Sequence, residues 1–488
     1  MSSVPNLAPA LPEIFLAIIG MALLMVGVFQ KKTDNDGEVR NARMISHLGV
    51  VAFVLTGLLV FTVSGPSLST FSGMFISDPF AVYFKVLVLI ASAMALIIAQ
   101  DFLEQHKIAK FEFTVLLIFA TLGMLMMVSA NNLLSLYIGL EMQSLALYVL
   151  ASFHRDDMRS TEAGLKYFVL GAVASGMLLY GASLVYGYAG TTDFVLLAQL
   201  FEHSPETGSS LGLIVGIVFI LAGLSFKVSA VPFHMWTPDV YEGAPTPVSA
   251  FFAVGPKLAA IALFIRVMVG PFGDLVGHWQ QIVVLISVAS MLLGAFAAIN
   301  QTNIKRLMAY SSIGNVGYAL IGLAVGTEAG VRGILIYMAI YLFMTTGAFA
   351  CILLMRRGGR MVENISDLAG LSKTHPLVAA ALAVFMFSMA GIPPLAGFFG
   401  KFYVFMAAIE GGLYALAIIG VLTSVVGAFY YIRIIKVAYF DEPGDPLDAD
   451  VGRNIALVIG ATSLAILLFF VYPGVVVDSA AAAAASLF

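Results

Sequence analysis

Long apolar stretches recur along this 488-residue sequence and constrain its fold more than any other feature. A bilayer with a hydrocarbon core of about 30 Å requires roughly 20 mainly apolar residues in each helix that crosses it. The residues are 60% hydrophobic and only 11% charged, whereas soluble proteins carry about a quarter of their residues as charged ones. The sequence therefore predicts an all-α polytopic membrane protein.

The spacing of the apolar stretches predicts about fourteen transmembrane helices. Their expected ranges, in chain order, are 8–29, 45–63, 80–99, 113–129, 131–153, 165–187, 211–241, 248–270, 279–299, 311–326, 332–355, 376–410, 412–439 and 454–472.

Two of these segments are too long for a straight crossing, and both contain helix breakers. Residues 211–241 contain Pro232 and Pro238, and residues 376–410 contain the sequence Gly-Ile-Pro-Pro at 391–394. Proline removes a backbone donor and clashes with the preceding turn, so both helices are expected to be discontinuous. They are the seventh and the twelfth, and this odd spacing predicts an inverted repeat that relates helices 4–8 to helices 9–13.

The expected repeat divides the chain into four parts. Three N-terminal helices occupy 1–112, the first repeat occupies 113–270, the inverted copy occupies 279–439, and a loop, helix 14 and a C-terminal tail occupy 440–488.

Basic residues alternate between the connections, and lysine and arginine in short loops mark the cytoplasmic side of a membrane. The opposite connections and both termini contain only Arg332, at the edge of a helix. We therefore expect a multi-pass protein of the bacterial inner membrane with both termini in the periplasm. The residues on the basic side are Lys31, Lys32, Arg40, Arg43, Lys107, Lys110, Arg155, Arg159, Lys305, Arg306, Arg356, Arg357, Arg360, Lys373 and Arg453.

Four ionisable residues lie well away from the ends of the expected helices, near the middle of the membrane, where a charge costs at least about 2.5–3.5 kcal/mol. They are Glu141, Lys227, Lys257 and Lys401. A fixed buried ion pair, such as one between Glu141 and Lys227, is the structural alternative. Burial favours a neutral lysine and a nearby carboxylate favours a charged one, so such a set can load and unload protons. The four charges exceed what packing requires, and they predict a proton relay.

Three other residues are assigned from their positions. Lys166 begins the sixth expected helix, where it could anchor the helix at the interface or belong to a channel. His234 lies at the first break near Lys227, where an ordinary hydrogen-bonding role and a relay role are equally open. Lys85 enters the third helix from the outside and is expected at the membrane interface.

The sequence offers no redox cofactor or nucleotide site. Cys351 is its single cysteine, which excludes a disulfide framework and an iron–sulfur cluster held by this chain alone. Neither a Gly-x-Gly fingerprint nor a phosphate-binding loop nor an HExxH metal motif is present. No basic stripe suited to nucleic acid is found either.

Three motifs resemble the antiporter-like proton-pumping subunits of respiratory complex I. Residues 226–247 read FKVSAVPFHMWTPDVYEGAPTP, residues 303–314 read NIKRLMAYSSIG, and residues 391–401 contain GIPP followed by Gly397, Phe398 and Lys401. The resemblance covers essentially the whole chain, and the first two motifs are highly specific.

The resemblance implies a proton-translocating membrane-arm subunit of NADH-quinone oxidoreductase, in which quinone is reduced elsewhere in the complex. It implies that Glu141 and Lys227 form a pair, that Lys257 is a central bridge and that Lys401 is the exit-side residue. FMN, iron–sulfur clusters and quinone are expected in other subunits, with no cofactor on this chain. Other membrane-arm subunits, further antiporter-like subunits among them, and membrane lipid are the expected partners.

The resemblance also discriminates among branches of the family. The opening residues 11–15 and residues 73–78 fit one of the three antiporter-like subunits best. The largest would carry a lateral helix after the last span, and the middle one usually has glutamate where Lys401 stands. Relatives often have histidine where this chain has Asn315, which can order water but cannot titrate. A subunit of a multisubunit sodium/proton antiporter is the alternative function, because it shares these helices and lysines.

Overall fold

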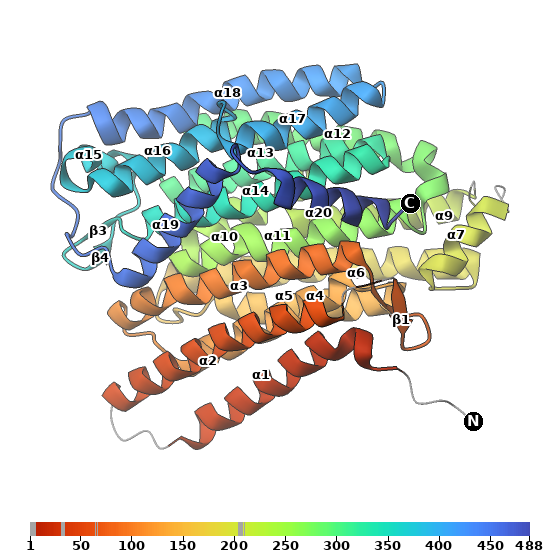
Figure 1. The fold of residues 1–488 in the computed structure, drawn as a ribbon, viewed down its shortest axis with the longest axis horizontal. Helices are drawn as coiled ribbons and strands as arrows, with labels where there is room; N and C mark the ends of the chain where they lie inside the picture. The colour runs from red at the N-terminus through yellow and green to blue at the C-terminus, as the bar shows by residue number, and fades with distance from the viewer. Residues whose placement is uncertain (1–5, 31–34, 64, 66, 204–207, 209) are drawn as a thin grey trace.

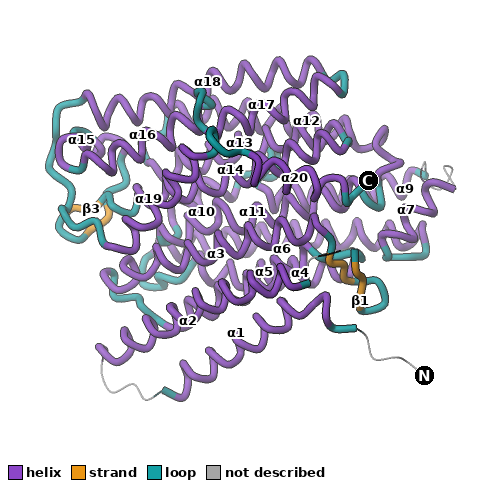
Figure 2. Tube along the Cα trace, in the orientation of Figure 1, coloured by secondary structure: helices purple, strands orange, loops and turns teal. Residues whose placement is uncertain are grey.

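The computed structural model describes residues 6–30, 35–63, 65, 67–203, 208 and 210–488. Most of them are helical, and the long helices lie side by side along one common direction (Figure 1). Figure 2 shows that loops gather at the two ends of this bundle and that the strands are confined to short hairpins. The fold is therefore the all-helical membrane bundle that the apolar stretches predict.

The N-terminal part contains three long helices and one hairpin. Its elements are η1 (Ala8–Ala10), α1 (Leu11–Phe29), α2 (Asn35–Thr62), β1 (Leu68–Thr70), β2 (Phe75–Ser77) and α3 (Pro79–Gln105).

The next part contains the first discontinuous helix, formed by α9 and α10. Its elements are α4 (Phe111–Val128), α5 (Leu133–Ala151), α6 (Met158–Ala189), α7 (Phe194–His203), α9 (Leu211–Val228), α10 (Trp236–Gly243) and α11 (Thr246–Val269).

The third part contains the second discontinuous helix, formed by α16 and α17. Its elements are η2 (Gly273–Leu275), α12 (Val276–Ile299), α13 (Ile304–Val325), α14 (Glu328–Ile352), β3 (Arg356–Arg357), β4 (Arg360–Met361), η3 (Ile365–Leu368), α15 (Leu371–Thr374), α16 (Pro376–Ala390), α17 (Ala396–Glu410) and α18 (Tyr414–Phe440). The chain ends with α19 (Arg453–Leu468) and α20 (Gly474–Ala485).

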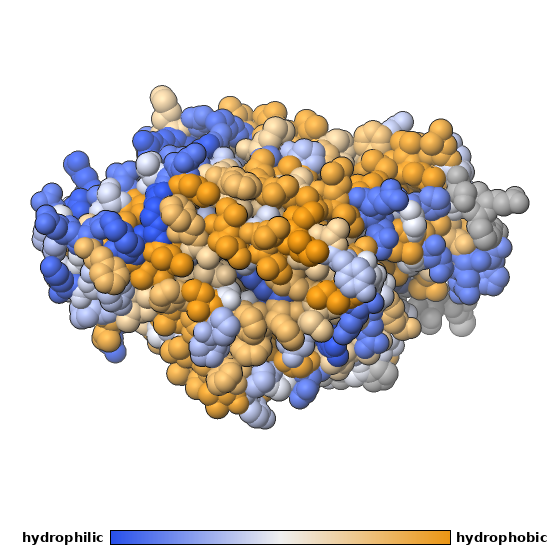
Figure 3. Space-filling view, turned by 90° about the horizontal axis from the view of Figure 1, so that it is seen from above, coloured by the Kyte–Doolittle hydropathy of each residue, from blue (hydrophilic) through white to orange (hydrophobic). Residues whose placement is uncertain are grey.

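Twelve of the described helices are long and apolar enough to cross a membrane. The other two predicted crossings correspond to α16 followed by α17 and to α19, which are shorter helices. The structure thus agrees with about fourteen crossings. The most apolar 18-residue stretch of α11 is entirely buried, and the corresponding stretches of α13 and α14 are 94% buried. These three helices therefore form the centre of the bundle. Seen from above in Figure 3, the middle of the molecule is mainly hydrophobic and hydrophilic side chains gather toward its two ends.

Both predicted helix breaks are present, and protein groups satisfy the freed backbone at each. At the first, the Trp236 indole donates to the Phe226 carbonyl at 3.1 Å, and the backbone N–H of Val231 donates to Ser290 Oγ at 2.9 Å. At the second, the backbone N–H of Gly397 donates to Ser388 Oγ at 3.0 Å. Broken backbone at membrane depth requires such partners.

Several helix boundaries differ from those predicted. Helix α2 begins at Asn35 rather than at 45, and α6 begins at Met158 rather than at 165, because their first turns are polar and extend beyond the apolar stretch. The expected tail after 472 is the helix α20, whose end lies beside α3, where the Phe80 backbone N–H donates to Ser486 Oγ at 3.3 Å. Pro473 separates α20 from α19.

The two ends of the described chain lie at the same end of the bundle (Figure 1). The Asn6 carbonyl accepts a hydrogen bond from Thr70 of β1, and α20 ends beside the start of α3. Ion pairs at the opposite end join connections predicted to be basic, such as Arg43 to Glu104 and Lys305 to Glu363. Lys31 and Lys32 of the first predicted basic connection lie outside the described residues.

Lys85 is buried, so its predicted place at the interface is wrong. Its side chain is 1% exposed, and its Nζ lies 2.7 Å from Oε1 of Glu13, which is 6% exposed. The Nζ also lies 4.9 Å from the centre of the Phe75 ring in β2. The hairpin and the start of α1 cover this part of α3, a tertiary arrangement that the local sequence does not reveal.

The substitution Glu13→Gln should destabilise the chain, because it leaves the buried Lys85 charge without its partner. Breaking one side of a buried ion pair costs about 3–5 kcal/mol. A denaturant titration of the purified chain in mixed micelles would measure the free energy of unfolding. The exposed pair of Arg155 and Asp156 gives a control, since Asp156→Asn should cost no more than about 1 kcal/mol. The double variant Glu13→Gln, Lys85→Met should recover much of the loss, and equal stabilities of Glu13→Gln and Asp156→Asn would contradict this account.

Candidate functional site

The four predicted intramembrane charges lie on four helices. Glu141 is in α5, Lys227 is in the last turn of α9 before the first break, Lys257 is near the middle of α11 and Lys401 is in α17 after the second break. Lys227, Lys257 and Lys401 are 5%, 1% and 6% exposed, and Glu141 is half-buried. None of the three lysines can therefore reach water along the surface of its helix.

Lys227 contacts the helix that carries Glu141 without touching its carboxylate. Its Nζ donates a hydrogen bond to Ser144 Oγ at 2.8 Å, one turn along α5 from Glu141. The carboxylate of Glu141 accepts a hydrogen bond from Ser175 Oγ of α6 at 2.5 Å. Among the described residues, these two charged groups form no direct ion pair, so Ser144 and Ser175 are the contacts that position them.

Lys257 has hydroxyl neighbours and, within the described chain, no carboxylate in ion-pair contact. Its Nζ donates a hydrogen bond to Ser312 Oγ of α13, and that oxygen also lies 2.7 Å from the Tyr341 hydroxyl of α14. The Nζ is 5.7 Å from the centre of the Tyr241 ring in α10. Lys257 thus links the first discontinuous helix to the centre of the bundle.

Lys401 completes the second helix break. Its Nζ donates to the carbonyls of Met389 and Ala390 at 2.9 and 3.3 Å, and to Ser424 Oγ of α18 at 2.8 Å. The two carbonyls belong to the last turn of α16, where the break leaves them without helical partners. Gly391 there has a φ of +87°, and a Cβ on it would approach Lys401 Cδ to 3.2 Å. The lysine charge is therefore held against the C-terminal end of α16.

A run of polar side chains on α13 connects the surroundings of Lys257 and Lys401. Ser311, Ser312, Asn315 and Tyr318 recur at helical spacing and share one face of α13. Ser312 meets Lys257, and the Tyr318 ring centre lies 4.8 Å from Lys401 Nζ.

Asn315 is the centre of this run. Its side-chain oxygen accepts from the Tyr337 hydroxyl at 2.6 Å, and its side-chain nitrogen donates to the Ser311 carbonyl at 2.8 Å and to the Tyr431 hydroxyl at 3.3 Å. The sequence prediction selected residues by their charge, so it found the lysines but missed Ser144, Ser175, Ser312 and these tyrosines. The i, i+4, i+7 spacing of polar residues in an apolar helix is the signal that could have found the run on α13.

His234 lies in the first break but is not joined to the lysines. Its ring is half-buried, and Nδ1 has no hydrogen-bond partner among the described residues. Neither Lys227 nor Lys257 is among its direct contacts in this part of the chain. The structure thus places His234 at the break, apart from the two lysines.

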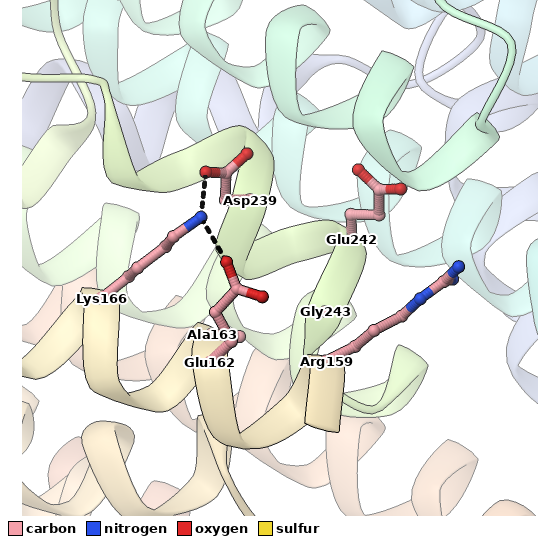
Figure 4. Close-up of a pocket in the computed structure, with 7 residues that line it drawn as sticks. All are labelled: Arg159, Glu162, Ala163, Lys166, Asp239, Glu242 and Gly243. Atoms are coloured by element: carbon pink, nitrogen blue, oxygen red, sulfur yellow. Dashed lines mark hydrogen bonds and ion pairs between the residues drawn. The ribbon is translucent and has the colours of Figure 1, made fainter. Parts of the chain in front are cut away.

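Lys166 lies apart from the buried lysines, in a charged pocket of about 210 Å³ (Figure 4). It projects from α6 between two carboxylates, with its Nζ 2.7 Å from Glu162 and 2.8 Å from Asp239. Arg306 of α13 binds Asp239 at 2.8 Å and Glu242 at 3.0 Å. Charged groups from α6 and α13 thus hold α10 at the end of the bundle that carries the basic connections.

Among the described residues, no group of three or more histidine, cysteine, aspartate or glutamate side chains is placed to hold a metal ion. Cys351 is buried and has no disulfide partner. The site consists of lysines, one carboxylate, hydroxyl groups and an amide, all of which can take part in hydrogen bonds that pass protons.

Comparisons with known proteins agree on one family. Residues 130–427 match the family described as NADH:quinone oxidoreductase/Mrp antiporter, TM. A protein of Rhodospirillum rubrum named NADH-quinone oxidoreductase subunit N is 62% identical over 481 residues, covering 99% of this chain and 97% of the relative. A protein of the same name from Paramagnetospirillum magneticum is 59% identical over 485 residues, covering 99% and 98%.

Solved structures share the fold. A chain in a structure of respiratory complex I from Thermus thermophilus with bound aureothin is 29% identical, with a TM-score of 0.81 over 96% of this chain and 99% of that one. A chain of an Mrp complex from a Dietzia species has a TM-score of 0.83 at 21% identity over 99% of this chain and 98% of that one, a likeness of fold alone.

Proposed function

This chain belongs to the NADH-quinone oxidoreductase subunit N family, and from this premise we propose that it moves protons through Lys227, Lys257 and Lys401. Members of the family are proton-translocating membrane-arm subunits of that oxidoreductase. The chain thus serves an oxidoreductase complex while its own residues handle protons. The observation that carries the proposed route is the series of hydroxyl and amide groups linking the surroundings of the buried lysines.

The proposed route starts at Glu141 and Lys227. The Ser144 hydroxyl is bonded to Lys227, and the Ser175 hydroxyl is bonded to Glu141. A change in the charge of Glu141 would act on Lys227 through a low-dielectric interior, where such an interaction is only weakly screened. Lys227 would then take up and release a proton, and no permanent ion pair with Glu141 would be needed.

The second half of the proposed route runs from Lys257 to Lys401 along α13. The hydroxyl of Ser312 contacts Lys257, Asn315 holds Tyr337 and Tyr431, and Ser424 contacts Lys401. Hydroxyl groups both donate and accept, so they can order water molecules between the two lysines. Asn315 cannot titrate and serves as a positioning residue.

A role for Lys166 and His234 is also proposed. Lys166, Glu162 and Asp239 would form a charged entrance at the end of the bundle that carries the basic connections. In the sequence, His234 lies between Lys227 and Asp239. The Nδ1 of His234, which has no hydrogen-bond partner in the described part of the chain, can accept or donate a proton through water.

The family also indicates the wider setting of the chain. We propose that other membrane-arm subunits, further antiporter-like subunits among them, pack beside it and that FMN, iron–sulfur clusters and quinone are held elsewhere in the complex. The division into 1–112, 113–270, 279–439 and 440–488 is retained as the proposed domain organisation. A sodium/proton antiporter subunit is not favoured, since the Mrp chain shares only the fold, at 21% identity.

Substitutions of Asn315 test the route between Lys257 and Lys401. Valine should lower NADH-driven proton uptake severalfold at normal assembly, because the partners Tyr337 and Tyr431 lose the group that orients them. Histidine, which keeps two hydrogen-bonding nitrogens, should retain most of the uptake. Proton uptake into sealed vesicles, normalised to assembled complex, is the measurement. Wild-type uptake by the valine variant would remove Asn315 from the route.

We propose the bacterial inner membrane as the location, with both termini in the periplasm. Single cysteines at Phe488 and Arg360, each in a Cys351→Ser background, should react with an impermeant reagent from opposite sides. Phe488 is exposed beside α20, and Arg360 is exposed among the basic connections. The Phe488 cysteine should react in intact cells whose outer membrane is permeable. If the cysteine at position 360 reacted in intact cells instead, the orientation would be reversed. If both cysteines reacted from the same side, the proposed topology would be discarded.

A further inference from the structure

A polar groove of about 510 Å³ opens where α2, α3 and α19 meet at the end of the bundle that carries the basic connections. Its lining residues come from the first half of α2, the last turns of α3, Arg356 of β3, and the start of α19 with the loop before it. Arg43 lies 19 residues before the end of α2 at Thr62, which is about 28 Å along a helix and close to the thickness of a bilayer core. The groove therefore lies at the level of lipid headgroups.

The groove contains equal numbers of positive and negative side chains. Arg43, Arg356 and Arg453 line it together with Asp101, Glu104 and Asp450. Arg43 and Glu104 neutralise each other through hydrogen bonds of 2.5 and 2.9 Å. Arg356 donates to Gln105 Oε1 and, at 3.4 Å, to the Asp450 carbonyl, and Asp450 Oδ1 accepts from the Gly452 backbone N–H at 3.0 Å. Arg453 and Asp101 remain to meet a ligand.

Arg453 and Asp101 are incompletely used within the protein. Arg453 is exposed and forms no ion pair with a described residue. Among the described residues, the Asp101 side chain accepts only a hydrogen bond of 3.3 Å, from the Asn454 amide. The Nε of Arg356 also has no partner in this part of the chain, but that nitrogen is buried and out of reach of a ligand. The groove thus offers one positive and one negative side chain to a ligand.

Apolar side chains continue from the groove toward the middle of the bundle. One turn below His47, α2 exposes Val51, and one turn below Asn454, α19 exposes Leu457, at 51% and 64%. On α3, the side chains of Ile97 and Ile90 are half-buried. A polar groove next to apolar helix surfaces matches the polar head and apolar tails of a phospholipid.

We propose that this groove binds a phospholipid with an ethanolamine headgroup. Arg453 would bind the phosphate, and Asp101 would accept hydrogen bonds from the primary ammonium group. Ionised partners make the stronger hydrogen bonds. A glycerol headgroup would leave Asp101 facing a net negative lipid, and a choline headgroup has no N–H to donate to it.

Lipid binding to the full-length purified chain tests this site. Native mass spectrometry with phosphatidylethanolamine, phosphatidylglycerol and phosphatidylcholine of identical acyl chains should show the first bound about tenfold more tightly than the others. Equal binding of the three lipids, or preference for phosphatidylglycerol, would overturn the proposal.

Two variants separate the roles of the two charges. Arg453→Gln should weaken binding of the ethanolamine and glycerol lipids alike by about tenfold, equivalent to about 1.4 kcal/mol. Asp101→Asn should weaken only the ethanolamine lipid by a similar factor and leave the glycerol lipid unchanged or tighter. Arg453→Lys and Asp101→Glu should retain most of the binding, which excludes loss through misfolding.

Matched controls lie outside the groove at the same end of the bundle. Arg360→Gln and Asp156→Asn change the same charges on exposed residues and should alter binding by less than twofold. An Asp101→Asn variant that binds phosphatidylethanolamine like the wild type would show that the ammonium group is not recognised.

Discussion

A complex carrying Lys227→Arg should assemble normally and oxidise NADH, yet its proton uptake should fall about tenfold or more. Arginine keeps the positive charge, but its pKa above about 12 means that it cannot release a proton. General acid–base groups contribute about 10²–10⁴ to a proton-transfer rate, so a tenfold loss is a conservative expectation. Arginine can also donate to Ser144 from a planar group with five N–H donors.

The contrast between arginine and alanine at this position separates a relay from a structural charge. If Lys227 only neutralised Glu141, arginine would serve as well as lysine. The structure places Lys227 on Ser144 rather than on the carboxylate, which favours a mobile proton over a fixed pair. Lys227→Ala should impair pumping and also reduce assembly, because the half-buried Glu141 carboxylate loses the positive charge held at Ser144, one turn away on the same helix. Wild-type uptake by Lys227→Arg would leave the structural role standing.

Replacing Lys257 by methionine should abolish uptake through this chain with little effect on assembly. Methionine has a similar length and apolar stem, and among the described residues no carboxylate contacts Lys257, so no charge is stranded. Ser312 and Tyr341 still satisfy each other at 2.7 Å. The proton route would lose its central group, while the buried core would gain an apolar side chain.

An exposed lysine supplies the control for this substitution. Lys436→Met removes a lysine that is 61% exposed and paired with Asp441 near the end of α18. Its uptake and assembly should match those of the wild type within about twofold, as expected for a surface ion pair. Loss of assembled complex in Lys257→Met but not in Lys436→Met would show that Lys257 is needed for folding.

Much of this fold follows from two physical rules applied to the sequence. The length of apolar stretches gave the crossings, and proline inside the segments 211–241 and 376–410 gave both breaks. These rules depend on local composition alone. The helix α20 was missed because it is short and follows Pro473, and α7 was missed because only one of its faces is buried.

The site was predictable in its charges but not in its contacts. Glu141, Lys227, Lys257 and Lys401 could be identified because a charge inside an apolar segment is costly wherever the helix packs. Their partners Ser144, Ser312 and Ser424 come from other helices, so only the packing of α5, α13 and α18 reveals them. Lys85 was misplaced for the same reason, since Glu13 is distant in sequence.

The number of protons translocated per NADH oxidised tests most directly whether this chain conducts protons through its lysines. The purified complex, reconstituted in sealed liposomes, would be compared for the wild type, Lys257→Met and Lys436→Met at equal amounts of assembled enzyme. The account predicts a lower ratio for Lys257→Met at any NADH oxidation rate that remains, and an unchanged ratio for Lys436→Met. A wild-type ratio in fully assembled Lys257→Met would contradict it, because protons would then cross without the central lysine.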